Sequence, residues 1–365
     1  MIARPEETRS DLESREFMRR DSEPKRAPLR AYGTWLFGML TLCALVIVVL
    51  RIGELERFVE LARGARPAWL LVALAIEVAT YAVAAGVWQR TLVAAGEPVP
   101  LYSLVPLGVA KIFTDQALPS AGLSGMVLLA HGLERRGIRS RLATSILIVS
   151  LISFYSSYLI AMLVSIGVLW MRNEAHPMLV SAAGIFSIVA IAVPAAVLWL
   201  RRWARGAQPT WLGKVPGLSL LLETVAETPT DLLRNGPMFV QTSLIHLSVF
   251  VLDALTFWVI FKMLGAPIGF MTAFIAFVMA SVVATISLIP LGLGTFEASA
   301  VTILSVLGVG VEVALAATLL LRGLTFWLPM LPGVWLAHRE MRGGGSSGAR
   351  SKDSTEPHVA KGEEV

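Results

Sequence analysis

Two charged side chains, Glu297 and Arg322, stand in segments that are otherwise almost entirely apolar. A charged side chain at the centre of a bilayer adds about 2.5–3.5 kcal/mol on insertion scales, so such a residue normally has a partner and often a function. A guanidinium group can bind a phosphate through two parallel N–H groups. The chemistry that this pair offers is therefore recognition of a charged group inside an apolar environment.

The segment around Glu297 carries residues that interrupt a helix. Residues 285–300 read TISLIPLGLGTFEASA, and proline and glycine both disfavour a continuous helix there. At membrane depth, backbone outside a helix is tolerated only where it is buried in protein or lines a wet cavity. We therefore predict that this break forms part of a binding site, with helix-end amides available to an anion. Its candidate substrate-binding residues are Pro290, Gly292, Gly294, Thr295 and Glu297.

Two interpretations of Glu297 and Arg322 stay open. In the first, both side chains face one cavity and bind a lipid headgroup. In the second, they form a buried structural ion pair that pins the broken segment to the last span. A buried pair is often no more stabilising than apolar residues of the same volume, so stability alone does not decide between these interpretations.

Four further polar residues fall within apolar segments at helical spacing. Lys111 and Asp115 are four residues apart and lie on one helical face, where they can form an internal pair at the entrance of a site. Alternatively, Lys111 reaches the interface with its long side chain. Asp253 and His246 are seven apart and can serve as a proton relay or hydrogen-bond between helices. Glu77 lies alone in its span, and the sequence assigns it no partner.

The composition indicates a membrane protein that crosses the bilayer several times. Of the 365 residues, 55% are hydrophobic and only 16% are charged, whereas soluble domains have roughly a quarter charged residues. The single cysteine excludes an intrachain disulfide. The net charge of +5 fits basic loops on one membrane face, so we expect no nucleic-acid partner, and we identify no cofactor or metal site.

Hydropathy divides the chain into tails, spans and broken segments. A span needs about 20 apolar residues. We predict a disordered tail over 1–31, which lacks the apolar core of a cleavable signal, a single transmembrane domain over 32–337, and a disordered tail over 338–365. The six full spans are expected at 32–50, 67–88, 143–171, 178–200, 239–263 and 311–336.

Two apolar segments are broken in the middle. Segment 101–130 contains Pro119, Gly122 and Gly125, and segment 273–307 contains the Pro–Gly stretch described above. Each is predicted to be a helix–break–helix hairpin that enters and leaves the membrane on one side. The predicted fold is therefore an all-α polytopic membrane protein with about six full transmembrane helices and two re-entrant helical hairpins.

The distribution of basic residues orients this layout. Most of the 31 lysine and arginine residues fall in segments that lie inside when both termini are cytoplasmic. The two hairpins then enter from opposite faces, which is the inverted-repeat pattern that builds sites near the midplane of transporters. We expect a multi-pass protein of the cell (inner or plasma) membrane.

The chain resembles a known family in these same segments. The patterns SLIPLGLGTFE (287–297) and LLLRGLTFWLPMLPG (319–333) are similar to the flippase-like membrane domain, which also forms the transmembrane region of lysylphosphatidylglycerol synthases. Looser agreement is found in the patterns ARPAWLLVAL (65–74), ALPSAGLSG (117–125), HGLERRGI (131–138) and LDALTFWVI (252–260).

This resemblance implies a bilayer-embedded module that binds, and flips, an anionic phospholipid or a polyprenyl-phosphate glycolipid. By match, Glu297 and Arg322 are its main polar residues. No block of residues corresponds to the soluble lysyl-transferase domain, so we expect that the chain is not an enzyme by itself and works beside a separate synthase or glycosyltransferase. The alternative is a membrane-embedded transferase, or an accessory subunit, acting on lipid-linked sugars or aminoacylated lipids.

Overall fold

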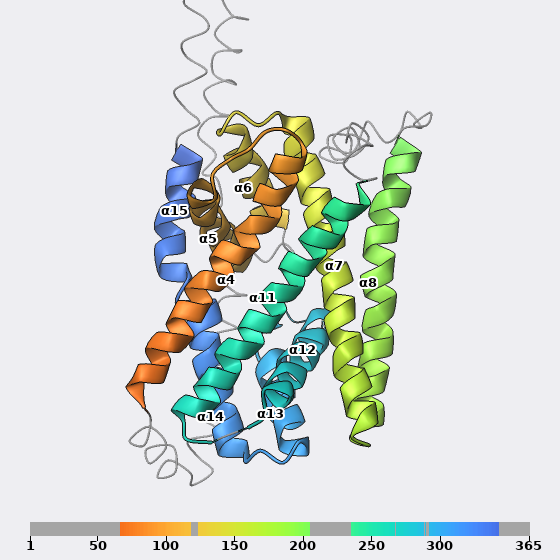
Figure 1. The fold of residues 1–365 in the computed structure, drawn as a ribbon, viewed down its shortest axis with the longest axis vertical. Coiled ribbons are helices and arrows are strands. Elements are labelled where there is room, and N and C mark those ends of the chain that lie inside the picture. Colours follow the sequence, from red (N-terminus) through yellow and green to blue (C-terminus); the bar gives the residue numbers. More distant parts are fainter. Residues whose placement is uncertain are drawn as a thin grey trace, which may run out of the picture.

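The computed structural model describes residues 66–117, 123–204, 235–266, 268–287, 289 and 292–342, which form helices with no β-strand among them (Figure 1). Within these ranges, five helices are long and apolar enough to cross a membrane. They are α4 (Pro67–Ala94), α7 (Ser140–Met171), α8 (Pro177–Ala204), α11 (Gly236–Met263) and a last one made of α14 (Val311–Arg322), the π-helical turn η3 (Gly323–Trp327) and α15 (Met330–Arg342). They match five of the six predicted spans. The sixth, 32–50, and the predicted tail 1–31 lie outside the described residues.

Helices α4 and α11 form an antiparallel pair through the middle of the structure (Figure 1). Pro67 opens α4 at a position where no backbone N–H is needed. The N–H of Arg66, just before it, donates to the carbonyl of Met263 at the end of α11 over 3.1 Å. Asn235 caps the start of α11, since its side chain accepts the N–H of Met238. The bond between Arg66 and Met263 therefore joins the two helices at one end, and the Asn235 cap defines where α11 begins.

Two pairs of shorter helices pack against this central pair. The first consists of α5 (Leu101–Ala117) and α6 (Leu123–Glu134), and the second of α12 (Phe270–Ile286) and α13 (Thr295–Val306). The longer member of each pair has 17 residues, or about 25 Å, less than the roughly 30 Å of a bilayer core. The two pairs lie towards opposite ends of the molecule, α5 and α6 in the upper half of Figure 1 and α12 and α13 in the lower half.

The helix lengths occur twice in the same order. Helices α4, α5, α6 and α7 have 28, 17, 12 and 32 residues. Helices α11, α12 and α13 have 28, 17 and 12 residues, and the apolar span that follows them has 31. In both series each helix packs on the next one. Within the described residues, two series of helices therefore share the same order of lengths and of sequential contacts.

One predicted boundary is wrong. Helix α15 runs to Arg342, so residues 338–342 belong to the folded part and not to the tail expected over 338–365. The reason is a contact between distant segments: Nη2 of Arg136, just after α6, lies 2.9 Å from Oε1 of Glu340, and Arg135 approaches the same carboxylate. Residues 343–365 lie outside the described residues, as do Pro119 and Gly122 of the first predicted hairpin.

Glycines let α5 approach its neighbours closely. A Cβ on Gly132 of α6 would clash with the side chain of Leu107, and a Cβ on Gly333 of α15 would clash with Cβ of Phe113. Because Cβ of Phe113 is fixed to the backbone of α5, it cannot move aside. The approach of α15 to α5 therefore depends on glycine at 333.

We expect Gly333→Ala to lower the free energy of unfolding by about 1–3 kcal/mol, the usual cost of overpacking. The measurement is thermal unfolding of the purified protein in detergent. The matched control is Gly184→Ala on α8, where an added Cβ meets nothing within 4 Å and alanine favours the helix. Equal unfolding temperatures for Gly333→Ala and the wild type would contradict the packing argument.

Candidate functional site

Arg322 ends α14 at the point where the helix changes its hydrogen-bond pattern. In the turn η3 that follows, the N–H of Leu328 donates to the carbonyl of Gly323 over 2.9 Å, a five-residue π-helical bond. Such single turns are frequent at functional sites because they re-aim side chains. In this structure the turn places Arg322, Thr325 and Phe326 at one cavity.

Glu297 holds Arg322 in place from the first turn of α13. Nε of Arg322 donates to Oε1 of Glu297 over 2.8 Å, and Oε2 accepts the N–H of Gly294 over 2.7 Å. Only 1% of Glu297 is exposed. A carboxylate at a helix N-terminus satisfies free amides and complements the helix dipole. Both of its oxygens are thus engaged, so Glu297 positions Arg322 rather than facing the cavity.

The turn before α13 requires glycine. Gly292 and Gly294 have φ angles of +61° and +83°, in the left-handed region. A Cβ on Gly292 would lie 2.7 Å from Cβ of Ala284 on α12. The hydroxyl of Thr295 donates to the carbonyl of Gly292 over 3.0 Å, and Nη2 of Arg322 donates to the same carbonyl over 3.4 Å. These three predicted residues therefore build the support of the site, while Pro290 lies outside the described residues.

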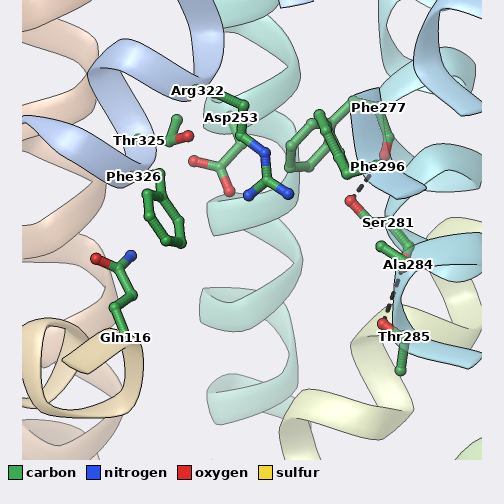
Figure 2. A pocket seen from close by; sticks show the side chains of 10 residues that line it. All are labelled: Gln116, Asp253, Phe277, Ser281, Ala284, Thr285, Phe296, Arg322, Thr325 and Phe326. Atoms are coloured by element: carbon green, nitrogen blue, oxygen red, sulfur yellow. Dashed lines mark hydrogen bonds between the residues drawn. The ribbon is translucent and has the colours of Figure 1, made fainter. Parts of the chain in front are cut away.

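A cavity of about 300 Å³ opens beside Arg322 (Figure 2). It is bordered by the end of α5, by α11, by both α12 and α13, and by α14 with η3, so both pairs of short helices contribute to it. Its lining residues are Gln116, Asp253, Phe277, Ser281, Ala284, Thr285, Phe296, Arg322, Thr325 and Phe326.

The guanidinium of Arg322 lies between two aromatic rings at this cavity. Its Cζ is 4.3 Å from the ring centre of Phe296 and 5.5 Å from that of Phe326, distances at which cation–π attraction stabilises the charge. Its side chain keeps 15% of its surface exposed. Its hydrogen bonds use Nε and Nη2, and no described residue accepts from Nη1. The guanidinium is therefore held rigidly and keeps N–H groups for an anion.

Asp253 points into the same cavity from α11 (Figure 2). Among the described residues, no hydrogen bond or ion pair engages its carboxylate. Gln116, at the end of α5, has a buried Oε1 that likewise lacks a partner within the described part of the chain. The cavity thus combines a cation that is paired with Glu297 and two acceptor side chains that no described residue pairs. This arrangement favours a bound ligand or a proton.

The predicted pair on α5 borders a second cavity of about 430 Å³. Nζ of Lys111 lies 2.7 Å from Oδ2 of Asp115, as predicted for residues four apart. Oδ1 of Asp115 accepts the N–H of Gly125 in α6 over 2.9 Å, so this carboxylate holds the two short helices together. His246 also borders this cavity, and its Nδ1 lies 3.1 Å from the hydroxyl of Ser153 on α7, a contact between helices.

The structure thus separates the predicted residues into three groups. Arg322 and Asp253 line the first cavity, and Lys111 and Asp115 line the second. Gly292, Gly294, Thr295 and Glu297 support Arg322 without lining the cavity. The sequence interpretation missed several polar lining residues. The missed residues are Gln116, Ser281, Thr285 and Thr325. Two of them could have been found, because Ser281 and Thr285 are polar and four residues apart in the otherwise apolar α12.

Comparisons with known proteins agree with this architecture. Residues 35–333 match the family described as "Lysylphosphatidylglycerol synthase TM region". The chain is also 25% identical over 318 residues to a "UPF0104 membrane protein" of Methanothermobacter thermautotrophicus, covering 82% of this chain and 92% of that protein. Within the described residues, no group of three or more His, Cys, Asp or Glu side chains is arranged to hold a metal ion.

We expect Glu297→Gln to lower the free energy of unfolding by about 3–5 kcal/mol, because it leaves the buried Arg322 without its charge partner. The double variant Glu297→Gln/Arg322→Met removes both charges and should recover most of this loss. Thermal unfolding in detergent measures both effects. Additive losses in the double variant would show that the two side chains do not depend on each other.

Proposed function

This chain belongs to the lysylphosphatidylglycerol synthase TM region family and is a multi-pass membrane protein, and from this premise we propose that it binds and flips a lipid with an anionic headgroup. The ligand class is an anionic phospholipid or a polyprenyl-phosphate glycolipid. The observation that carries the proposal is the guanidinium of Arg322, which is fixed by Glu297 and turns N–H groups that no described residue accepts towards a cavity among apolar helices. A planar guanidinium with free N–H groups is well suited to a phosphate.

The size and walls of the cavity support a headgroup ligand. About 300 Å³ lies at the lower end of the range of small-molecule sites. The rings of Phe277, Phe296 and Phe326 give it apolar walls, while the hydroxyls of Ser281 and Thr285 can accept or share hydrogen bonds. Ser281 donates to the carbonyl of Phe277, so its oxygen can still accept from a donor such as a sugar hydroxyl. Thr285 donates to the carbonyl of Ser281, and its hydroxyl also lies 3.3 Å from that of Tyr158.

The repeated order of helix lengths supports a transport mechanism. We propose that α5–α6 and α12–α13 are re-entrant hairpins that enter the bilayer from opposite faces and meet at the Arg322 cavity. Inverted repeats of this kind place a site near the midplane and expose it to each side in turn as one half rocks against the other. The lipid tails would stay in the bilayer while the headgroup crosses through the protein.

The second cavity provides a further cationic position for such a path. Lys111 lies there beside Asp115, and His246 borders the same space. Both cavities touch neighbouring residues at the end of α5, Asp115 in the second and Gln116 in the first. A headgroup that leaves Arg322 would therefore reach Lys111 by passing the end of α5.

The proposal places the protein in the cell membrane with both termini inside, in agreement with the bias of basic residues. In this function the chain moves a lipid and catalyses no covalent step. A separate synthase or glycosyltransferase would supply or consume the lipid.

A liposome assay tests the proposal. Purified protein is reconstituted with fluorescent phosphatidylglycerol or a fluorescent polyprenyl phosphate, and movement is followed by quenching of the outer leaflet. We expect the wild type to move one of these probes and Arg322→Met to be slower by about 10- to 100-fold, since a hydrogen bond to a charged group contributes about 1.5–3 kcal/mol.

Two variants separate chemistry from folding. Glu297→Gln/Arg322→Met should fold as the wild type does and still fail to move lipid. The surface variant Arg139→Met, whose side chain is 81% exposed, should keep normal rates. If the wild type moves no probe while it stays folded, or if the double variant is fully active, the proposed role of Arg322 is refuted. A covalently modified lipid product would favour the transferase alternative.

A further inference from the structure

Glu77 is a buried acid that the proposed headgroup site does not use. It lies on α4, and only 2% of the residue is exposed. Its Oε2 is buried and has no hydrogen-bond partner among the described residues. The hydroxyl of Tyr81, one helical turn further on, is also buried and lies beside this carboxyl group. An ionised carboxylate in such a place is costly unless a proton or a cation neutralises it.

Asp253 faces Glu77 across the interface of α4 and α11. These two helices are packed side by side along the centre of the structure. The carboxyl groups of Glu77 and Asp253 interact electrostatically, and Tyr81 interacts with both of them. Asp253 has no ion-pair partner among the described residues, so two acids approach each other inside the membrane domain with no cation placed between them.

The other titratable groups around this pair are already engaged or lie elsewhere. Arg322, across the cavity on α14, is paired with Glu297. Lys111 on α5 is paired with Asp115. His246 on α11 contacts Ser153. Helix α7 carries two phenols: Tyr155 borders the second cavity, and the hydroxyl of Tyr158 lies 3.3 Å from that of Thr285. Helix α12 carries no titratable group.

We propose that Glu77 and Asp253 together hold one proton, and that this proton crosses the membrane with the anionic headgroup. The proposal rests on the proposed function, because it gives the coupling of the same transport step. The proton forms an O–H bond with one carboxylate, coming from water on one side, and this bond breaks by release to water on the other side. No group is oxidised or reduced.

The coupling follows from the position of Asp253 in the headgroup cavity. An ionised Asp253 repels an anionic headgroup at Arg322, whereas a pair that holds a proton repels it less. Headgroup binding therefore favours proton binding, and by linkage proton binding favours the headgroup to the same extent. Glu77 supplies the second carboxylate, which makes simultaneous ionisation of both acids unfavourable.

Infrared spectroscopy tests for the proton without any lipid movement. At near neutral pH the wild type in detergent should show the C=O band of a protonated carboxyl group, which isotope exchange shifts. Glu77→Gln and Asp253→Asn should each remove this band. The control is Glu97→Gln, a carboxylate-to-amide change at a surface ion pair, which should leave the band unchanged. If the wild type shows no such band, or if neither variant removes it, the proton site is refuted.

The coupling is tested with fluorescent phosphatidylglycerol in liposomes that carry a pH gradient. If one proton moves with each lipid, a gradient of about one pH unit supports up to about a tenfold difference in probe between leaflets, towards the side to which protons flow. Glu77→Gln should abolish this accumulation, and Glu97→Gln should retain it. A wild type that distributes the probe equally despite the gradient refutes co-transport.

The outcomes separate this inference from the proposed function. The infrared band together with absent lipid movement refutes the proposed function and leaves the proton site in place. Lipid movement that is independent of the pH gradient and depends on sodium refutes the inference and leaves the proposed function in place. The same holds if the protein prefers an amine-bearing lipid while both acids are ionised.

Discussion

The structure depends on the ion pair between Arg322 and Glu297. Both side chains are removed from water, and a buried pair is tolerated only when its remaining hydrogen-bonding groups are satisfied. Glu297 meets this condition by accepting the N–H of Gly294. Arg322 meets it in part, by donating to the carbonyl of Gly292, and turns its other N–H groups to the cavity. The start of α13 must therefore face the end of α14, and the turn before it must accept positive φ angles. The pair thus determines the local fold as well as the charge of the cavity.

The other helices are arranged around the central pair α4–α11. Each of its members begins a series of helices with matching lengths, and each series contains a pair of short helices that contributes to the cavity. The cavity lies where the end of α5 approaches α12 and α13, so neither series forms it alone. A site shared in this way responds to any movement of one series relative to the other, which is the property that a transporter requires.

Hydropathy, together with the positions of proline and glycine, predicted the helical class, five described spans and the break before α13. These signals are informative because proline, glycine and charged residues are rare within apolar runs. They identified Arg322 and Asp253 for the same reason. They could not distinguish the roles of Glu297 and Arg322, since that depends on which atoms face a cavity. Gln116 was missed because an isolated amide carries no periodic signal, and the end of α15 was misplaced because Glu340 is held by arginines some 200 residues earlier.

The π-helical turn at Gly323–Trp327 gives the last span an adjustable phase. One residue more or fewer in such a turn rotates everything beyond it by about 100° and shifts it by about 1.5 Å. Beyond the turn stands Glu340, which meets Arg135 and Arg136 near the end of α6 only in the present phase. Arg322 stands before the turn. A change of register in this turn would therefore alter the orientation of Arg322 relative to Glu340, and with it the ion pairs between Glu340 and the arginines that follow α6.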